Sequence, residues 1–445
     1  MDFLDKLVIP QSAEHIQLLH YLLILILFLF IPFVSLVFGS TILSLYYKIK
    51  GIKESNDIKL KFAKDVIETL TINKSIGIIL GIVPVITAIL IYAQLLQGTN
   101  ANISSYLIFS LLFVSIGLIL IYIYRYSMSF MEIYNSVKIV DPQEEEIAVK
   151  ISKYRNANIR LTRSGYYGII FLFIGIWMFI ASTAVASYPA MWGEYKILYM
   201  MFFWKVLSHL FAFISVSLAL TGAAIFFTFF YWEGGKHLKD NAYKDFVKKV
   251  AAGISFTGTL SMPLFVFTDI FTVPENSLSG SIFFYTTLAL ILLFAAYLFL
   301  YSMVKNSDLK FSGHIFIVVL LALFMLIVRD QKVLQSSTES QTVAMNTRYE
   351  IMMAELTGAG NEKAAISGEQ IYKNICSSCH SFDHKVVGPP YNQTLPKYEG
   401  HIDRLIAFIR NPTQNNPGYP PMPNPGLTPT EADSIAHYIM ATYEK

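Results

Sequence analysis

The chain has 445 residues, of which 54% are hydrophobic and 15% are charged, and its formal net charge is +3. This composition is too apolar for an ordinary soluble protein, and the small net charge gives no indication of a nucleic-acid partner. The apolar excess lies before residue 331, and the remaining residues have an ordinary soluble composition. We therefore expect a membrane domain at 1–330 followed by a soluble domain.

Eight apolar segments in the first part are candidates to cross a bilayer, which takes about 20 residues. They lie at 16–46, 75–97, 103–128, 164–188, 200–232, 246–273, 280–304 and 312–329. All should be helices, because lipid offers the backbone no other hydrogen-bond partner. The predicted fold class is all-α: a polytopic bundle of about eight transmembrane helices, followed by a small soluble helical domain.

The loops between these segments alternate in charge. Those after the first, third, fifth and seventh segments carry lysine and arginine, whereas those at 98–102, 189–199 and 274–279 carry almost none. Basic loops remain in the cytoplasm. The sequence therefore predicts that the N-terminus and everything after Arg329 lie on the periplasmic side of a bacterial inner membrane.

Histidines lie in three of the apolar segments or at their edges. His20 in the first segment and His209 in the fifth lie at similar depths, near the outer ends of their helices. Ionisable side chains in a bilayer are candidates for function, and two imidazoles at one depth can hold a b-type haem between helices. His15 and His314 are further candidates. The alternative for each is a histidine that hydrogen-bonds a neighbouring helix or lies at the interface.

The sixth segment holds two more candidates, Met262 and Asp269. Met262 precedes Pro263, and its thioether could ligate a haem iron; packing is the alternative. Asp269 lies near the outer end of the segment. It could accept a proton or lie beside a haem propionate, and a carboxylate that caps a helix end is the alternative.

The membrane segments resemble subunit I of the cytochrome bd quinol oxidases. The resemblance rests on the Ile-Asn-x-x-x-Gly-x-x-x-Gly stretch at 72–81, the Gln-Gly-Thr-Asn stretch at 97–100, and the positions of His20 and His209. It implies two four-helix bundles with haem-ligating histidines in the first and fifth helices. The chain departs from that family at 274–279, where a short turn replaces a long loop that contributes to quinol oxidation.

Residues 331–365 join the membrane domain to the soluble domain at 366–445. They are polar and non-periodic at first, and Met345 to Leu356 can form a short amphipathic helix. We consider a movable tether and a strap packed against the membrane domain as alternatives.

The chain's two cysteines both lie in Cys376-Ser-Ser-Cys379-His380. C-x-x-C-H is the attachment site of a c-type haem. Cys376 and Cys379 would form thioethers to the porphyrin vinyl groups, and His380 would bind the iron. The alternatives are a chance match or a thioredoxin-like cysteine pair, and the flanking sequence favours the haem.

Residues 366–445 resemble a class I cytochrome c domain. The Gly-Pro-Pro-Tyr stretch at 388–391 is similar to the family's loop whose proline carbonyl accepts a hydrogen bond from the haem histidine. The resemblance implies this orienting role for Pro389. It also implies that Met422, in the Tyr-Pro-Pro-Met-Pro stretch at 419–423, is the second axial ligand.

Four other side chains in this domain are rival ligands. Met440 is predicted to pack in a closing helix over 431–443, and His384 is too close to His380 to cross the haem easily. His401 and His437 are predicted to be surface or capping residues. A haem with histidine and methionine ligands has no open position, so it should transfer electrons at a relatively high potential.

Together these features predict a membrane-bound b/c-type cytochrome that contains haem c and haem b. It would pass electrons between a membrane donor, for which we favour quinol, and a periplasmic redox protein. One alternative is a bd-like terminal oxidase that receives electrons through its haem c. Another is an electron-transfer subunit of a larger respiratory complex, anchored in the lipid and with no catalysis of its own.

Overall fold

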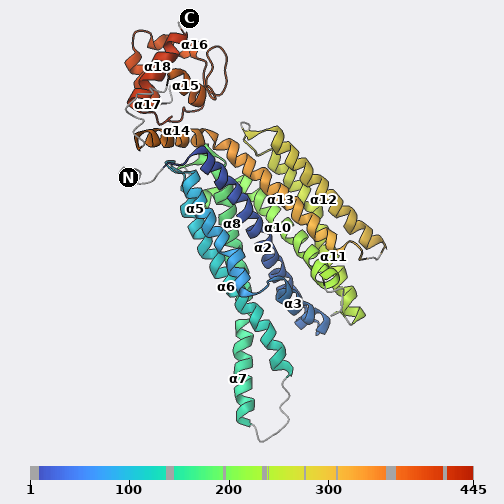
Figure 1. The fold of residues 1–445 in the computed structure, drawn as a ribbon. Helices are drawn as coiled ribbons and strands as arrows, with labels where there is room; N and C mark the ends of the chain where they lie inside the picture. Colours follow the sequence, from blue (N-terminus) through green and yellow to red (C-terminus); the bar gives the residue numbers. More distant parts are fainter. Residues whose placement is uncertain are drawn as a thin grey trace. The chain divides into compact units, whose positions relative to one another are not determined.

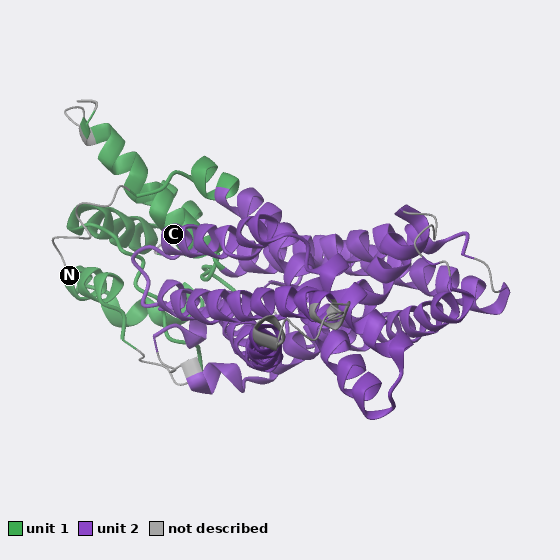
Figure 2. Ribbon diagram, turned by 90° about the horizontal axis from the view of Figure 1, so that it is seen from below, with its two compact units in different colours: residues 1–18, 338–445 green, residues 19–337 purple. Residues whose placement is uncertain are grey.

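The computed structural model describes residues 10–136, 145–193, 197–232, 238, 240–274, 277–306, 309–356, 367–413 and 418–443. Every regular element in these ranges is a helix, which confirms the all-α prediction. Eight of the helices are long and apolar enough to cross a membrane, again as predicted (Figure 1). The chain divides into two compact units, one formed by residues 19–337 and the other by residues 1–18 and 338–445 (Figure 2).

The larger unit contains the apolar helices and the shorter helices between them. These are α2 (Ala13–Lys53), α3 (Asp57–Leu70), α4 (Lys74–Gly81), α5 (Val83–Leu95), α6 (Ile103–Ser136), α7 (Glu145–Leu161), α8 (Ser164–Ala186), α9 (Ile197–Met201), α10 (Trp204–Ile225), the π-helical η3 (Phe226–Trp232), α11 (Asn241–Ile270), α12 (Gly280–Asn306) and α13 (Ser312–Ser337). The first residues of α2, up to Leu18, belong to the smaller unit.

The helices of the larger unit pack in two groups. Helix α6 contacts α5 and α8 in one group, and α10 to α13 contact their neighbours in the other. Helix α2 contacts both through aromatic pairs, with ring centroids 4.8 Å apart for Phe30 and Phe179 of α8, and 5.0 Å apart for Phe28 and Phe324 of α13. The apolar stretch of α2 is accordingly mostly buried.

Helices α10 and α11 approach each other closely because glycines lie where they cross. A Cβ atom on Gly222 of α10 would lie 2.7 Å from the carbonyl oxygen of Ala251 in α11, and one on Gly258 would clash with the backbone at Ala219. Small residues of this kind let membrane helices pack backbone against backbone. At the other end of the same helix pair, the first turns of α10 lie beside the last turns of α11, where the Ser208 and Thr268 hydroxyls are 2.8 Å apart.

The smaller unit contains short helices around one apolar core. They are α14 (Glu339–Leu356), α15 (Gly368–Ile371), the π-helical η6 (Tyr372–Cys376), α16 (Tyr391–Thr394), α17 (Ile402–Arg410) and α18 (Pro429–Tyr443). Helix α18 packs on α15 and α17 through buried residues that include Ile371, Leu405 and Ile435. It begins with a capping box, in which the Thr428 N–H donates to Glu431 at 2.7 Å and the Glu431 N–H donates to the Thr428 hydroxyl.

The predicted linker at 331–365 includes the end of α13 and all of α14. Residues 357–365 lie outside the described residues. Within the smaller unit, α14 contacts η6, and the Ala13 N–H donates to the Asn346 side chain at 2.7 Å. The role of this segment as a movable tether stays a prediction.

Candidate functional site

Cys376, Cys379 and His380 lie in one tight turn. Cys376 ends η6, and the His380 N–H donates to its carbonyl at 2.8 Å. The Gly388 N–H donates to the Cys379 carbonyl, also at 2.8 Å, which fixes the following loop against the motif. Both cysteines are free. The turn therefore offers two thiols and an imidazole from five consecutive positions.

Burial raises the pKa of the Cys376 thiol to about 11. A thioredoxin-like pair needs a cysteine with a lowered pKa, because the thiolate is the nucleophile. The environment of Cys376 has the opposite effect. It fits a sulfur that carries a covalent thioether, and it does not favour the redox-active cysteine pair that the spacing alone allowed.

The His380 ring is held by the loop at 388–391. Its Nδ1 lies 2.9 Å from the Pro389 carbonyl oxygen, so Nδ1–H can donate there and leave the Nε2 lone pair for a metal. A Cβ atom on Gly388 would clash with the imidazole. The ring of Tyr391 lies nearly parallel to it, with centroids 5.2 Å apart. This loop therefore determines the orientation of His380.

A cavity of about 250 Å³ opens beside the motif. The structure brings Cys376, His380, Pro389 and Met422 to its wall, although Met422 comes from a distant loop. The remaining wall is mostly apolar and includes Leu395, Leu405, Phe408, Ile435 and Ile439. A thiol, an imidazole and a thioether around an apolar pocket fit a c-type haem. Met422 and His380 are the residues that would hold its iron.

The rival ligands lie elsewhere in this unit. Met440 is 7% exposed and packs in the core beneath α18, while His384 and His437 are exposed. The Nδ1 atom of His437 lies 2.9 Å from the Asp433 carbonyl oxygen, and that of His384 lies 3.1 Å from the Ser381 hydroxyl. None of these side chains, nor the exposed His401, lines the cavity.

The predicted haem b residues of the membrane domain are in different environments. His20 is 5% exposed, and neither ring nitrogen has a hydrogen-bond partner among the described residues. Buried polar groups are normally hydrogen-bonded, so an imidazole with two unpaired nitrogens is a candidate to bind a ligand. His209 instead has its Nε2 atom 2.6 Å from Asp269 Oδ1. It lines a cavity that His20 does not line. Haem b ligation by either histidine stays a prediction.

The other histidines and the methionine named from the sequence contribute little to this site. Met262 is 2% exposed in α11 and does not line the cavity next to His209. His314 is exposed at the start of α13, with Phe299 and Phe311 beside its ring. His15 is exposed in the first turn of α2.

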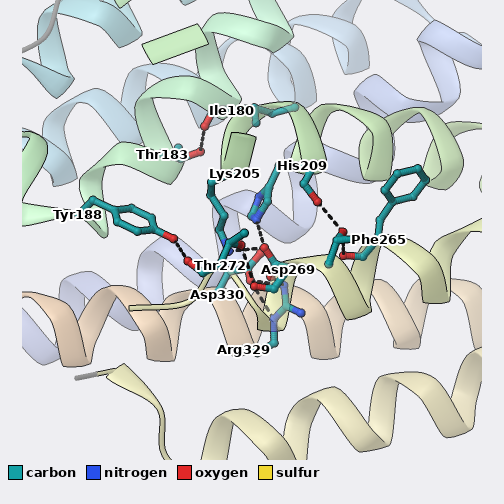
Figure 3. A network of polar contacts seen from close by, with 12 residues as sticks. Ile180, Thr183, Tyr188, Lys205, His209, Phe265, Asp269, Thr272, Arg329 and Asp330 are labelled. Atoms are coloured by element: carbon teal, nitrogen blue, oxygen red, sulfur yellow. Dashed lines mark hydrogen bonds and ion pairs between the residues drawn. The ribbon is translucent and has the colours of Figure 1, made fainter. Parts of the chain in front are cut away.

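Asp269 lies at the centre of a buried polar network (Figure 3). One carboxylate oxygen contacts Lys205 and His209 of α10, and the other contacts Arg329 of α13. The Arg329 guanidinium also donates to Asp330 at 2.6 Å. Asp269, Lys205 and Arg329 are 3%, 5% and 4% exposed. Buried charges are stable only when they are paired. The pairs of this network link α10, α11 and α13.

The sequence pointed to Asp269 and His209, but not to Lys205 or Arg329. Lys205 lies one helical turn before His209, so both project from one face of α10. Arg329 was placed at the boundary of the last apolar segment, whereas α13 continues to Ser337. Two features of the sequence could have identified these partners. Lys205 is a cation one turn before the membrane histidine His209, and Arg329 lies at a comparable depth in another helix.

A cavity of about 170 Å³ adjoins this network. One part of its wall is polar and is formed by Lys205, His209, Asp269, Arg329 and Gln331. The rest is largely apolar and includes Leu27, Phe30, Val34, Phe213, Phe265 and Leu323. The cavity is thus amphipathic, and all its lining residues belong to the larger unit.

Comparisons with known proteins identify relatives of the smaller unit. The family described as cytochrome C oxidase, cbb3-type, subunit III matches residues 363–439. Cytochrome c-551 of Azotobacter vinelandii is 35% identical over 78 residues, which are 17% of this chain and 95% of that protein. Cytochrome c-551 of Stutzerimonas stutzeri is 35% identical over 97 residues, which are 20% of this chain and 93% of that protein.

These comparisons support the predicted haem c and its role in electron transfer. No solved structure matches the chain. The resemblance of the membrane domain to subunit I of the bd oxidases stays a prediction.

Proposed function

Because this chain belongs, through its C-terminal domain, to the family of small c-type cytochromes that includes the cytochromes c-551, we propose that it links a membrane-dissolved electron donor to a redox protein outside the cytoplasm. Quinol is the donor that we favour. The observation that carries this proposal is one chain with both a haem c site and eight membrane-spanning helices. The haem supplies one-electron transfer when it is bound.

The residues of the smaller unit support this use of the haem. Met422 and His380 would both hold the haem iron, which would leave no open position for oxygen. The Pro389 carbonyl would hold the imidazole in one orientation and increase its basicity as a ligand. The mostly apolar wall would give the haem surroundings of low polarity, which affect its potential.

The proposed orientation places the haem c domain on the periplasmic side. The loops after the first, third, fifth and seventh apolar helices carry most of the lysine and arginine of the membrane domain, and such loops remain in the cytoplasm. With eight spans, both ends of the membrane domain then lie outside. Asp269 and His209, at the end of α11 and the start of α10, would lie toward the same face.

Two other functions remain candidates, each with one supporting observation. The unpaired nitrogens of buried His20 support a haem b in the membrane domain, which a bd-like oxidase fed through its haem c would need. The matched family is named after a subunit of an oxidase, which supports an anchored electron-transfer subunit in a larger respiratory complex.

The purified full-length protein can test the main proposal. Anaerobic addition of a short-tailed quinol should reduce the haem c, followed by its optical absorbance, and a pyridine haemochrome assay should report haem b beside haem c. A haem c that ascorbate reduces and quinol does not would overturn quinol as the donor. Oxygen uptake with a reduced small donor would instead favour the oxidase.

A further inference from the structure

We propose that the cavity beside Asp269 is a binding site for the ring of a quinol, with His209 as the group that accepts its proton. This inference rests on the proposed function, since it names the place where the membrane donor would bind. It depends on the charge balance of the network, on buried atoms without partners, and on the size and lining of the cavity.

The charges around the cavity balance without a ligand. Lys205 and Arg329 supply two positive charges, and Asp269 and Asp330 supply two negative charges. A further anion would be left without a counter-charge in a buried site, which is costly. A haem b in this cavity would bring two propionates. The balance therefore favours a neutral ligand.

Two polar atoms of cavity-lining residues have no hydrogen-bond partner among the described residues. They are Nη1 of Arg329, a donor, and Oε1 of Gln331, an acceptor. Both residues are more than nine-tenths buried. Buried polar groups are normally paired, so a ligand that both donates and accepts would complete them. A quinol hydroxyl does both, and a quinone carbonyl accepts from the arginine.

The size and lining of the cavity fit a single ring system with an apolar tail. Its volume is about 170 Å³. Phe30, Phe213 and Phe265 line its apolar part, away from the charged side chains. Ligand sites commonly combine such an apolar wall with a few convergent polar groups.

His209 is placed to accept a proton. If its Nε2–H donates to Asp269, the lone pair lies on Nδ1, and the carboxylate stabilises the imidazolium that forms. The quinol O–H bond breaks, its proton goes to Nδ1, and one electron reduces a ferric haem to the ferrous state. A second such step, after His209 has released the first proton, yields the quinone. One quinol thus reduces two ferric haems.

Binding of a quinol analogue tests the site without relying on activity. Fluorescence quenching of 2-heptyl-4-hydroxyquinoline N-oxide by the full-length protein gives its dissociation constant. Gln331→Leu removes the unpaired acceptor and should weaken binding about tenfold. Gln335→Leu is the matched control, because it makes the same change one turn later in α13 and outside the cavity lining. Its dissociation constant should stay within about twofold.

Two further variants keep the proposal falsifiable. Ala212→Phe fills the apolar part of the cavity and should abolish binding, while an unchanged unfolding transition by circular dichroism shows that the membrane helices are folded. His209→Gln can still donate to Asp269 but cannot take up a proton. It should bind the analogue within about threefold of the wild type, yet slow haem c reduction by quinol about 100-fold.

The outcomes separate the two proposals. Equal binding by the wild type, Gln331→Leu and Ala212→Phe overturns this site. If quinol still reduces haem c in all of them, the proposed function stands and the quinol binds elsewhere. Binding that responds to the variants as expected, without any reduction of haem c by quinol, supports the site and overturns quinol as the electron donor.

Discussion

The haem c site and the membrane network differ in how the chain assembles them. The haem c cavity takes Cys376, His380 and Pro389 from one short stretch that also holds Cys379, whereas Met422 and most of the apolar wall come from farther along the chain. The network takes one or two residues from each of α10, α11 and α13, and its contacts join residues about 60 positions apart. A local site has a spacing that can be recognised, whereas a dispersed site has none until the helices pack.

The largest expected effect is the loss of haem c in a Cys376→Ala, Cys379→Ala double variant. Without either thiol no thioether can form, so denaturing gels stained for haem should show no signal. Ser377→Ala, within the same motif, should keep the full signal. Covalent haem in the double variant would contradict the assignment of this site. The haem c site would then not be recognisable from its local motif, and its contrast with the membrane network would be lost.

Replacement of Met422 by Leu should remove the sixth ligand while haem attachment persists. The reduction potential should fall, because a methionine ligand raises it, and the ferric spectrum should lose its sulfur-to-iron band. Met440→Leu is the control, since it changes the other methionine of residues 366–445 at similar volume, and core swaps of this kind cost less than about 1.5 kcal/mol. A lost band in Met440→Leu, with a retained one in Met422→Leu, would reverse the assignment.

Asp269→Asn tests the network by leaving Lys205 and Arg329 buried without their shared counter-charge. Breaking a buried pair in this way should lower the free energy of unfolding by about 3–5 kcal/mol. Glu54→Gln is the control, because the Glu54 side chain is 42% exposed in its pair with Lys59, away from the network, and such a pair contributes little to stability.

Unfolding in mixed micelles, followed by circular dichroism, measures both of these variants. The haem c spectrum of Asp269→Asn should remain that of the wild type, since the two units have separate cores. Equal destabilisation by the two variants would show that the buried network is no more important than a surface pair.

The sequence predicted the membrane helices well because a bilayer imposes a long apolar length on each of them. It predicted their ends less well. Helix α2 continues to Lys53, beyond its apolar segment. Helix α7 forms at 145–161, where the sequence predicts only a basic loop between two segments. A helix can extend beyond the membrane where its residues are amphipathic. Hydropathy identifies only the apolar part of such a helix and does not predict where the helix ends.

The same contrast applies to the sites. The Cys376–His380 motif identified haem c because its chemistry requires adjacent residues, and the comparisons support that cofactor. Asp269 was recognised as unusual, but its partners were not, because they depend on how α10, α11 and α13 pack. The hydrogen bond between His209 and Asp269 likewise depends on how α10 packs against α11, which the two segments do not reveal when they are considered separately.

The smallest expected effect tests whether the haem c domain also depends on local interactions for stability. The Ser367 side chain caps α15 by accepting the Gln370 N–H at 3.3 Å, so Ser367→Ala should cost about 1 kcal/mol. Unfolding of the full-length protein, followed by haem c absorbance, measures this loss. Ser377→Ala removes only an exposed bond to the Lys373 carbonyl and should stay within about 0.5 kcal/mol. If the two variants unfold alike, the cap is unimportant and the domain depends on its α15–α18 packing instead.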